Sequence, residues 1–186
     1  MPPLGVVFTR WGKATCPSSA GTQLIYAGIV VGSHRSEGGS AEYICLHSQP
    51  QFLRTTAGLQ NTRTRLYGTE YEPLDNPPAL GNLLRHDAPC SVCYTPARST
   101  KLIIPGRTSC PTSWTREYYG YYMSEAQYDH HKSKMPICID VNAESVPGSA
   151  SNTVRSLLYF METTCIGVLC PPYFSGAEIT CVVCTK

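Results

Sequence analysis

The chain has 186 residues with a net charge of +2, 42% hydrophobic residues and only 15% charged residues. This composition supports a packed core and excludes a disordered chain. The lysines and arginines are scattered, and no apolar run reaches the roughly 18 residues of a membrane-spanning helix. The net charge therefore gives no reason to expect a polyanion as a partner, and we expect neither nucleic-acid binding nor a membrane span.

Short apolar runs, rich in β-branched and aromatic residues, recur along the chain. They are typical of β-strands, whereas the 15 Gly and 15 Pro residues interrupt nearly every window that a helix would need. In chain order, the predicted strands are 6–8, 24–26, 29–31, 43–46, 101–104, 118–123, 157–161 and 179–184. The predicted loops are 32–41, 74–81 and 146–153. The sequence therefore predicts an all-β protein with long irregular loops.

Eight of the ten cysteines form two copies of one pattern. The pattern Cys16, Cys45, Cys90 and Cys93 recurs as Cys110, Cys138, Cys181 and Cys184, at offsets of 94, 93, 91 and 91 residues. A nearly constant offset over four positions indicates a duplicated module of about 90 residues. We therefore predict two tandem, pseudo-symmetric β subdomains, residues 1–97 and 98–186, that pack tightly together.

Ten cysteines in a chain of this size indicate an oxidising compartment, and hence a secreted, extracellular protein. Zinc is the alternative, because Cys-x-x-Cys occurs twice. Zinc ribbons, however, place two such pairs about 15–20 residues apart, whereas here each pair lies near the end of its own half. We therefore predict disulfides, with no metal and no other cofactor.

Strand geometry limits how these cysteines can pair. Residues i and i+3 of a strand point to opposite faces about 10 Å apart, whereas a disulfide requires Cα atoms within about 7 Å. On a strand, Cys90 and Cys93 therefore cannot bond to each other, and each must bond to another cysteine of its half. Two pairings remain open in each half. Cys165 and Cys170, which have no counterpart in the first half, fit a local link across a tight turn.

Each half opens and closes on a similar string. The openings are Cys16-Pro17-Ser18 and Cys110-Pro111-Thr112, and the closings are Cys90-Ser91-Val92-Cys93 and Cys181-Val182-Val183-Cys184. These strings resemble those of the C-terminal non-collagenous domain of collagen IV, which is itself a tandem duplication. The chain is more similar still to the globular ends of short-chain collagens of sponges and other invertebrates. The strings that carry this second resemblance are 8–13, 86–90 and 146–149.

The resemblance implies a fold, a disulfide pairing and a role. Collagen IV ends are all-β with two similar subdomains, and the opening cysteine of each subdomain bonds to its last cysteine. Carried over to this chain, the implied pairs are Cys16–Cys93, Cys45–Cys90, Cys110–Cys184 and Cys138–Cys181, which leaves Cys165–Cys170. The implied role is structural, in the extracellular matrix, with a homo-oligomer or other matrix proteins as partners.

No group of side chains has the pattern of a catalytic site, so we do not expect an enzyme. Every cysteine has a disulfide partner in this scheme, and the Gly-x-Ser-x-Gly and His-Glu-x-x-His motifs are absent. Asp129-His130-His131 could hold a metal ion only in a loop, and a solvated polar loop is the favoured interpretation. His86-Asp87 could be an acid–base pair, but a hydrogen-bonded turn that orients the next strand is favoured.

Aromatic residues are the remaining candidates for recognition. Tyr118, Tyr119, Tyr121 and Tyr122 could stack on sugars, but we favour a role in the core on one strand face and in an interface on the other. Trp11 and Trp114 are expected to anchor the core or an interface. We thus favour a secreted, self-associating matrix module. The alternative is a soluble glycan-binding, lectin-like protein whose similar halves offer two similar pockets.

Overall fold

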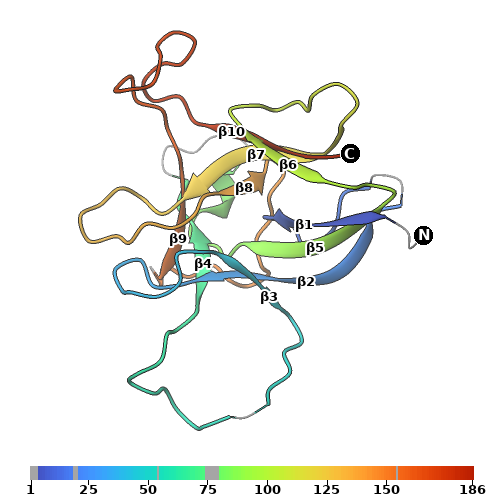
Figure 1. Cartoon of the computed structure of the whole chain (residues 1–186). Helices are drawn as coiled ribbons and strands as arrows, with labels where there is room; N and C mark the ends of the chain where they lie inside the picture. Colours follow the sequence, from blue (N-terminus) through green and yellow to red (C-terminus); the bar gives the residue numbers. More distant parts are fainter. Residues whose placement is uncertain (1–3, 19–20, 54, 74–79, 154) are drawn as a thin grey trace.

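The computed structural model describes residues 4–18, 21–53, 55–73, 80–153 and 155–186 (Figure 1). These residues form an all-β fold, as expected, whose one helical element is the 3-10 turn Gly81–Leu83. The described strands of the first half are β1 Gly5–Trp11, β2 Gln23–Gly32, β3 Ile44–His47, β4 Tyr67–Tyr71 and β5 Pro89–Pro96. Those of the second half are β6 Lys101–Pro105, β7 Thr115–Ser124, β8 Ile137–Asp140, β9 Ser156–Phe160 and β10 Thr180–Thr185.

The strands differ from the predicted ones in two ways. The predicted strands 24–26 and 29–31 are parts of one strand, β2, which pairs with β5 along its length despite a register shift. Strands β4, β5 and β8 were not predicted, because each lacks a long apolar run: β4 contains Glu70, β8 contains Asp140, and β5 has a proline at each end. Residues 74–79 of the predicted loop 74–81 lie outside the described residues.

The strand pairings of the first half recur in the second. In the first half, β5 lies between β1 and β2, and β2 also pairs with β3 and β4. In the second half, β10 lies between β6 and β7, and β7 also pairs with β8 and β9. All of these pairs are antiparallel. The sequence repeat is therefore matched by a repeat of strand connections.

Two parallel pairings join the halves. Strand β1 meets β8 where Trp11 lies opposite Ile139, and β4 runs beside β9 over three residues from Thr69 opposite Ser156. With the β7–β9 pairing, these contacts close a circuit of strands, β1-β5-β2-β4-β9-β7-β8. Three described strands lie outside this circuit: β3 pairs with β2, β10 pairs with β7, and β6 pairs with the outer side of β10. Of these, β3 and β6 are at edges.

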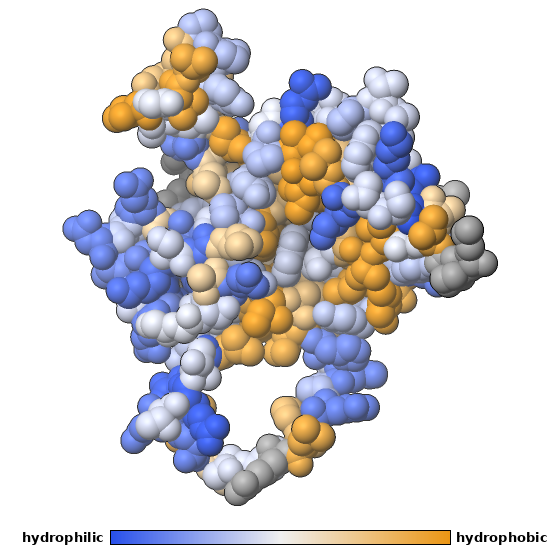
Figure 2. Space-filling model, in the orientation of Figure 1, coloured by the Kyte–Doolittle hydropathy of each residue, from blue (hydrophilic) through white to orange (hydrophobic). Residues whose placement is uncertain are grey.

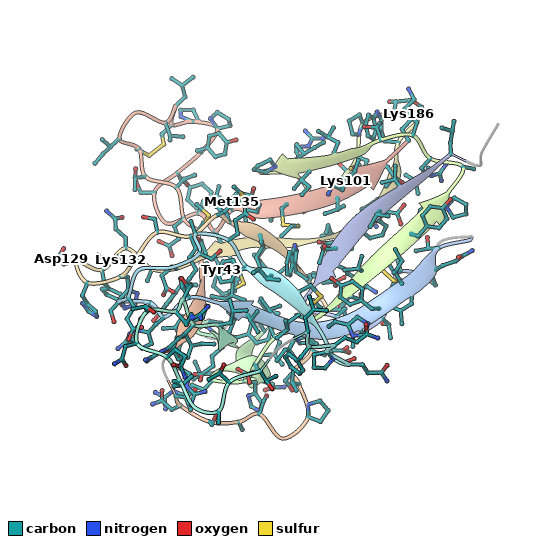
Figure 3. All side chains as sticks on the ribbon, turned by 60° about the horizontal axis from the view of Figure 1, so that its bottom comes forward. Tyr43, Lys101, Asp129, Lys132, Met135 and Lys186 are labelled. Carbon is teal, nitrogen blue, oxygen red and sulfur yellow. A yellow bond between two sulfur atoms is a disulfide. The ribbon has the colours of Figure 1, made fainter. Side chains whose placement is uncertain are left out.

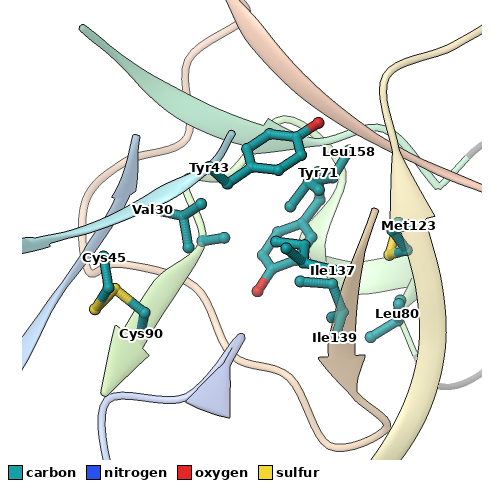
Figure 4. Close-up of a cluster of buried hydrophobic side chains, with 11 residues drawn as sticks. Val30, Tyr43, Cys45, Tyr71, Leu80, Cys90, Met123, Ile137, Ile139 and Leu158 are labelled. Atoms are coloured by element: carbon teal, nitrogen blue, oxygen red, sulfur yellow. A yellow bond between two sulfur atoms is a disulfide. The ribbon is translucent and has the colours of Figure 1, made fainter. Parts of the chain in front are cut away.

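The main buried cluster draws on both halves (Figure 4). Its members are Val30, Tyr43, Cys45, Tyr71, Leu80, Ala88 and Cys90 from the first half, and Met123, Ile137, Ile139 and Leu158 from the second. A second buried cluster is shared in the same way and consists of Phe8, Cys93, Tyr118, Cys138, Cys181 and Val183. Neither half therefore encloses a hydrophobic core of its own, and burial of apolar area holds the halves together.

All ten cysteines form disulfides. The bonds are Cys16–Cys93, Cys45–Cys90, Cys110–Cys184, Cys138–Cys181 and Cys165–Cys170, the pairs implied by the resemblance. Cys90 and Cys93, three residues apart on β5, belong to different buried clusters, because their side chains leave opposite faces of the strand. Each such strand is therefore bonded covalently on both faces.

Gly28 of β2 and Gly120 of β7 are places where a neighbouring strand approaches very closely. A Cβ atom on Gly28 would lie 2.0 Å from the carbonyl oxygen of Leu46, and a Cβ on Gly120 would lie 1.8 Å from that of Ile139. A side chain at either position would therefore push β3 or β8 away from its partner strand.

Removal of a core disulfide should cost more stability than removal of the exposed one. Cys138→Ala with Cys181→Ala opens a loop with a sequence separation of 43 and should lower the free energy of unfolding by about 4 kcal/mol. Cys165→Ser with Cys170→Ser opens a separation of only 5 and should cost about 2 kcal/mol or less. Urea unfolding followed by circular dichroism measures both, and equal losses would contradict the prediction.

Substitution of Gly120 should be strongly destabilising although it adds a single methyl group. Gly120→Ala should lower the free energy of unfolding by about 3 kcal/mol or more, because β8 must move away. The control is Gly38→Ala, where an added Cβ has nothing within 4 Å and the change should stay within about 0.5 kcal/mol. Thermal unfolding compares the two variants, and a Gly120→Ala protein as stable as the parent would refute the close β7–β8 approach.

Candidate functional site

Ion pairs between the halves gather beside the β1–β8 pairing. Two guanidinium nitrogens of Arg10 lie 2.8 and 2.7 Å from Asp140 Oδ2. Lys13 Nζ lies 3.0 Å from Glu144 Oε2, and the Ala14 amide donates to Glu144 Oε1 at 2.9 Å. Partial burial raises the pKa of Glu144, but the Ala14 amide and Lys13 together bring this pKa below its ordinary value. These contacts fix the position of the second half on the first.

Three ionisable side chains are buried together where β7 leads into the loop before β8. Lys134 Nζ lies 2.6 Å from Glu125 Oε2, and His131 Nδ1 lies 3.0 Å from Glu125 Oε1. The side chains of Lys134, Glu125 and His131 are only 0%, 1% and 2% exposed. Burial lowers the pKa of His131, an effect that Glu125 opposes and that Arg35 and His130 reinforce. At neutral pH Lys134 is therefore the counter-ion of Glu125, and the imidazole is neutral.

The expectation of a solvated loop at Asp129-His130-His131 is only partly correct. Asp129 and His130 are exposed, and Asp129 lies toward the outer end of the loop (Figure 3), but His131 turns inward to Glu125. In the part of the chain that the structure describes, no three His, Cys, Asp or Glu side chains are placed to hold a metal ion. Sequence reasoning missed Glu125 and Lys134, because nothing in the local pattern marks them as buried.

His86 and Asp87 lie in a hydrogen-bonded segment just before β5. The His86 amide donates to Leu83, and His86 Nδ1 lies 3.0 Å from the carbonyl oxygen of Leu84. The Asp87 amide donates to Ser149 Oγ at 3.1 Å. These contacts fit the turn interpretation, and they also tie the first half to the 146–149 segment of the second. Burial raises the pKa of Asp87, and the nearby Glu70 adds to this effect.

The four tyrosines of β7 do not share one surface. Tyr118 is buried, and its hydroxyl lies within hydrogen-bonding distance of one backbone carbonyl from each half, at 3.0 and 3.1 Å. Tyr121 and Tyr122 pack against different buried clusters. The guanidinium of Arg116 lies 4.7 Å above the ring of Tyr119. The arrangement therefore offers no continuous aromatic platform on which a sugar could stack.

The two tryptophans have different surroundings. Trp11 packs against the main buried cluster at the point where β1 meets β8. Trp114 is half-buried and belongs to neither buried cluster. Trp11 thus anchors the core, one of the two roles expected of the tryptophans, and an interface role for Trp114 stays a prediction.

Strands β3 and β6 are edge strands. Among the described strands, β3 pairs only with β2, and β6 pairs only with β10. Both carry exposed aliphatic side chains: Ile44, Leu46, Leu102 and Ile103 are 37% to 40% exposed. An edge strand with apolar side chains is a ready site for association with another chain.

Residues 162–178 form an arm that projects from the strands (Figure 1). Backbone hydrogen bonds hold its stem, among them the Thr163 amide to the Ala177 oxygen at 2.9 Å, and Cys165–Cys170 closes the tip. The tip exposes apolar side chains, seen as an orange patch in Figure 2: Ile166, Leu169 and Phe174 are 66% to 88% exposed. An exposed apolar patch of this kind marks an interaction surface.

Three pockets have unlike linings. One, of about 280 Å³, adjoins the Glu125 cluster and is lined by the 124–136 segment and Met161. Another, of about 390 Å³, lies between residues 34–38 and 61–65 and is lined by arginines, hydroxyls and a histidine. The third, of about 210 Å³, is lined by Arg10 and by residues 116–119 and 140–142. The first two include the loops that follow the equivalent strands β7 and β2, but their linings are not alike.

No protein-family model and no curated protein matches this chain. Within the described residues, no helix has the length and apolarity needed to cross a membrane. The assignment of a function therefore depends on the surfaces and buried charges described above.

Acidification should weaken the protein through His131. Because the folded-state pKa of His131 lies below its unfolded value, the unfolded chain binds more protons as the pH falls through about 6.5. Stability should therefore decrease from pH 7.5 to pH 5.5, and His131→Gln should remove part of that decrease. Urea unfolding at the two pH values measures it.

The matched control is His130→Gln, the exposed neighbour, which should keep the pH dependence of the parent. If both variants retained the full decrease between pH 7.5 and pH 5.5, His131 would not be its source.

Proposed function

We propose that this chain is a secreted structural module of the extracellular matrix that associates with copies of itself head to tail. The contact would join β3 of one copy to β6 of the next. The observation that carries the proposal is that the β1–β8 pairing between the halves has no counterpart within the described part of the chain, although the repeat provides equivalents of both strands. Strand β8 pairs with β1, whereas the repeat equivalents of these strands, β3 and β6, are both edge strands.

The cysteine offsets relate these strands residue by residue. The offset of 93 residues places β8 on β3, and the offset of 94 residues places β1 on β6. Gly12 and Gly106, which are equivalent under the second offset, both have a positive φ, of 87° and 76°. The backbone therefore turns in the same way after β1 and after β6, which supports their equivalence.

Exposed residues on the two edges correspond to buried residues at the contact between the halves. Ile44 and Leu46 correspond to Ile137 and Ile139, and Leu102 corresponds to Phe8. Ile137, Ile139 and Phe8 are no more than 9% exposed, because the other half covers them. A second copy placed on these edges would bury their counterparts in the same way, and burial of aliphatic side chains would drive the association.

The β1–β8 contact within the chain and the proposed β6–β3 contact between copies differ in their charged residues. At the positions equivalent to Arg10 and Asp140 stand Ile104 and His47, so the ion pair between the halves has no equivalent at the edges. The contact between copies would thus be apolar, whereas the contact within a chain is apolar and ionic. Because β3 and β6 are unlike surfaces, such a contact is heterologous and produces a closed ring or an open chain of copies.

Further observations support an extracellular structural role. Five disulfides are typical of oxidising compartments. The resemblance of the framework to the C-terminal domains of collagen IV and of invertebrate short-chain collagens favours a matrix assembly protein. The glycan-binding alternative, with two similar pockets, is less favoured because the pockets beside the equivalent loops after β2 and β7 have unlike linings.

Charged substitutions at the two edges should abolish self-association one edge at a time. Leu46→Glu blocks β3, and Leu102→Glu blocks β6, because each places a charge where an apolar contact would form, and two charges of the same sign cannot pair with each other. Size-exclusion chromatography with light scattering should give a single chain for each variant and a larger mass for the parent. An equimolar mixture should give a dimer that does not grow, because each variant retains the edge that the other needs.

The control is Leu59→Lys, a substitution of an exposed leucine away from both edges, which should keep the mass of the parent. A monomeric parent would rule out self-association. Variants that keep the mass of the parent, or a mixture that stays monomeric, would rule out the β3–β6 contact.

A further inference from the structure

We infer that the pocket between residues 34–38 and 61–65, here called the arginine pocket, binds sulfate groups of an acidic polysaccharide. The pocket has a volume of about 390 Å³, and its charged lining residues are Arg63, Arg65 and Glu37. This inference does not depend on the proposed self-association, because the arginine pocket includes neither β3 nor β6.

Among the described residues, the two arginines of the pocket have no side-chain partners. With the described residues, neither guanidinium of Arg63 and Arg65 forms a hydrogen bond or an ion pair, although Arg65 is partly buried. Other arginines are engaged: Arg10 pairs with Asp140, and Arg116 donates to the carbonyl oxygen of Thr108. A guanidinium presents a planar set of donors that matches the oxygens of a sulfate or carboxylate group.

Neutral donors lie beside the arginines. Thr62 and Thr64 contribute hydroxyl groups, and Asn61 contributes an amide. His34, whose Nδ1 lies 3.3 Å from the Ser36 amide, completes the polar lining. Such a set of donors suits an anion that accepts several hydrogen bonds at once.

The sequence around the pocket is depleted in acidic residues. Between Glu42 and Glu70 the chain has three arginines and no aspartate or glutamate. Glu37 is the one acidic residue in the lining. A chain with a net charge of only +2 thus concentrates positive charge on one segment, which attracts a negatively charged partner locally.

The pocket lies where two loops approach each other. An added Cβ on Gly39 would lie 3.3 Å from a side-chain carbon of Thr64, so the loop after β2 lies against the segment that leads into β4. Figure 2 shows hydrophilic side chains along that limb of the long loop between β3 and β4. A linear polymer could lie along this surface while one of its anionic groups occupies the pocket.

The lining favours a polysaccharide over a nucleic acid. Single-stranded nucleic acids are bound by aromatic rings on which bases stack, and the lining of the pocket has no Tyr, Phe or Trp. The five disulfides also indicate an oxidising compartment such as the extracellular space rather than the cytosol or the nucleus.

Titration calorimetry with a heparin oligosaccharide tests the inference, using variants that act in opposite directions. Arg63→Gln with Arg65→Gln should raise the Kd at least about tenfold, because two charge-assisted contacts are lost. Glu37→Gln should lower the Kd, because it removes the one carboxylate of the lining, and a folding defect cannot imitate a gain in affinity.

The control for net charge is Lys101→Gln with Lys186→Gln, two exposed lysines labelled in Figure 3, which should change the Kd by less than about twofold. Absence of binding by the parent, or an equal loss in the control, would overturn the inference. Equal affinity for desulfated heparin would refute sulfate recognition, and equal affinity for single-stranded DNA would show general attraction to polyanions instead.

Discussion

The pairs of disulfides that leave opposite faces of β5 and β10 are the constraint on which the rest of the structure depends. Cys90 and Cys93 are three residues apart on β5, so one side chain enters the main buried cluster and the other enters the second. Their partners, Cys45 and Cys16, come from distant parts of the half, at separations of 45 and 77 residues. Closing loops of this length in the unfolded chain removes much of its conformational entropy. This stabilisation allows long loops on a fold without α-helices.

Because the unit is repeated, the contact between β1 and β8 has equivalent strands, β6 and β3, that do not pair with each other in the described chain. The halves share both buried clusters, and the β1–β8 and β4–β9 pairings join them into one circuit of strands. Because one chain has only one such contact, Ile139 is buried while its counterpart Leu46 is exposed. Apolar residues that are buried in one half and exposed at the equivalent positions of the other half favour association with a second copy of the chain. This argument does not depend on any family resemblance.

In a chain with few charged residues, the presence or absence of a partner distinguishes charges that hold the fold together from charges that can bind a ligand. Arg10 with Asp140 and Lys134 with Glu125 are paired at short distances in largely buried places, where they specify how segments fit together. Arg63 and Arg65 have no such partners among the described residues, so their charge is available to a ligand. The small net charge of the chain does not reveal which charges are paired and which are not, because it is a sum over all charged groups.

The sequence by itself determined the repeat of the cysteine framework and the all-β class, because spacing and local alternation are displayed directly by a single chain. The exclusion of a Cys90–Cys93 bond was conditional on both cysteines lying on a strand, and the structure supplied that condition by placing them on β5. The tertiary structure decided that β4, β5 and β8 are strands, since their ladders are formed with residues far away in sequence. It also decided that Glu125 and Lys134 are buried, whereas Arg63 and Arg65 have no side-chain partners in the part of the chain that the structure describes. The environment of a charge is set by the elements that pack around it.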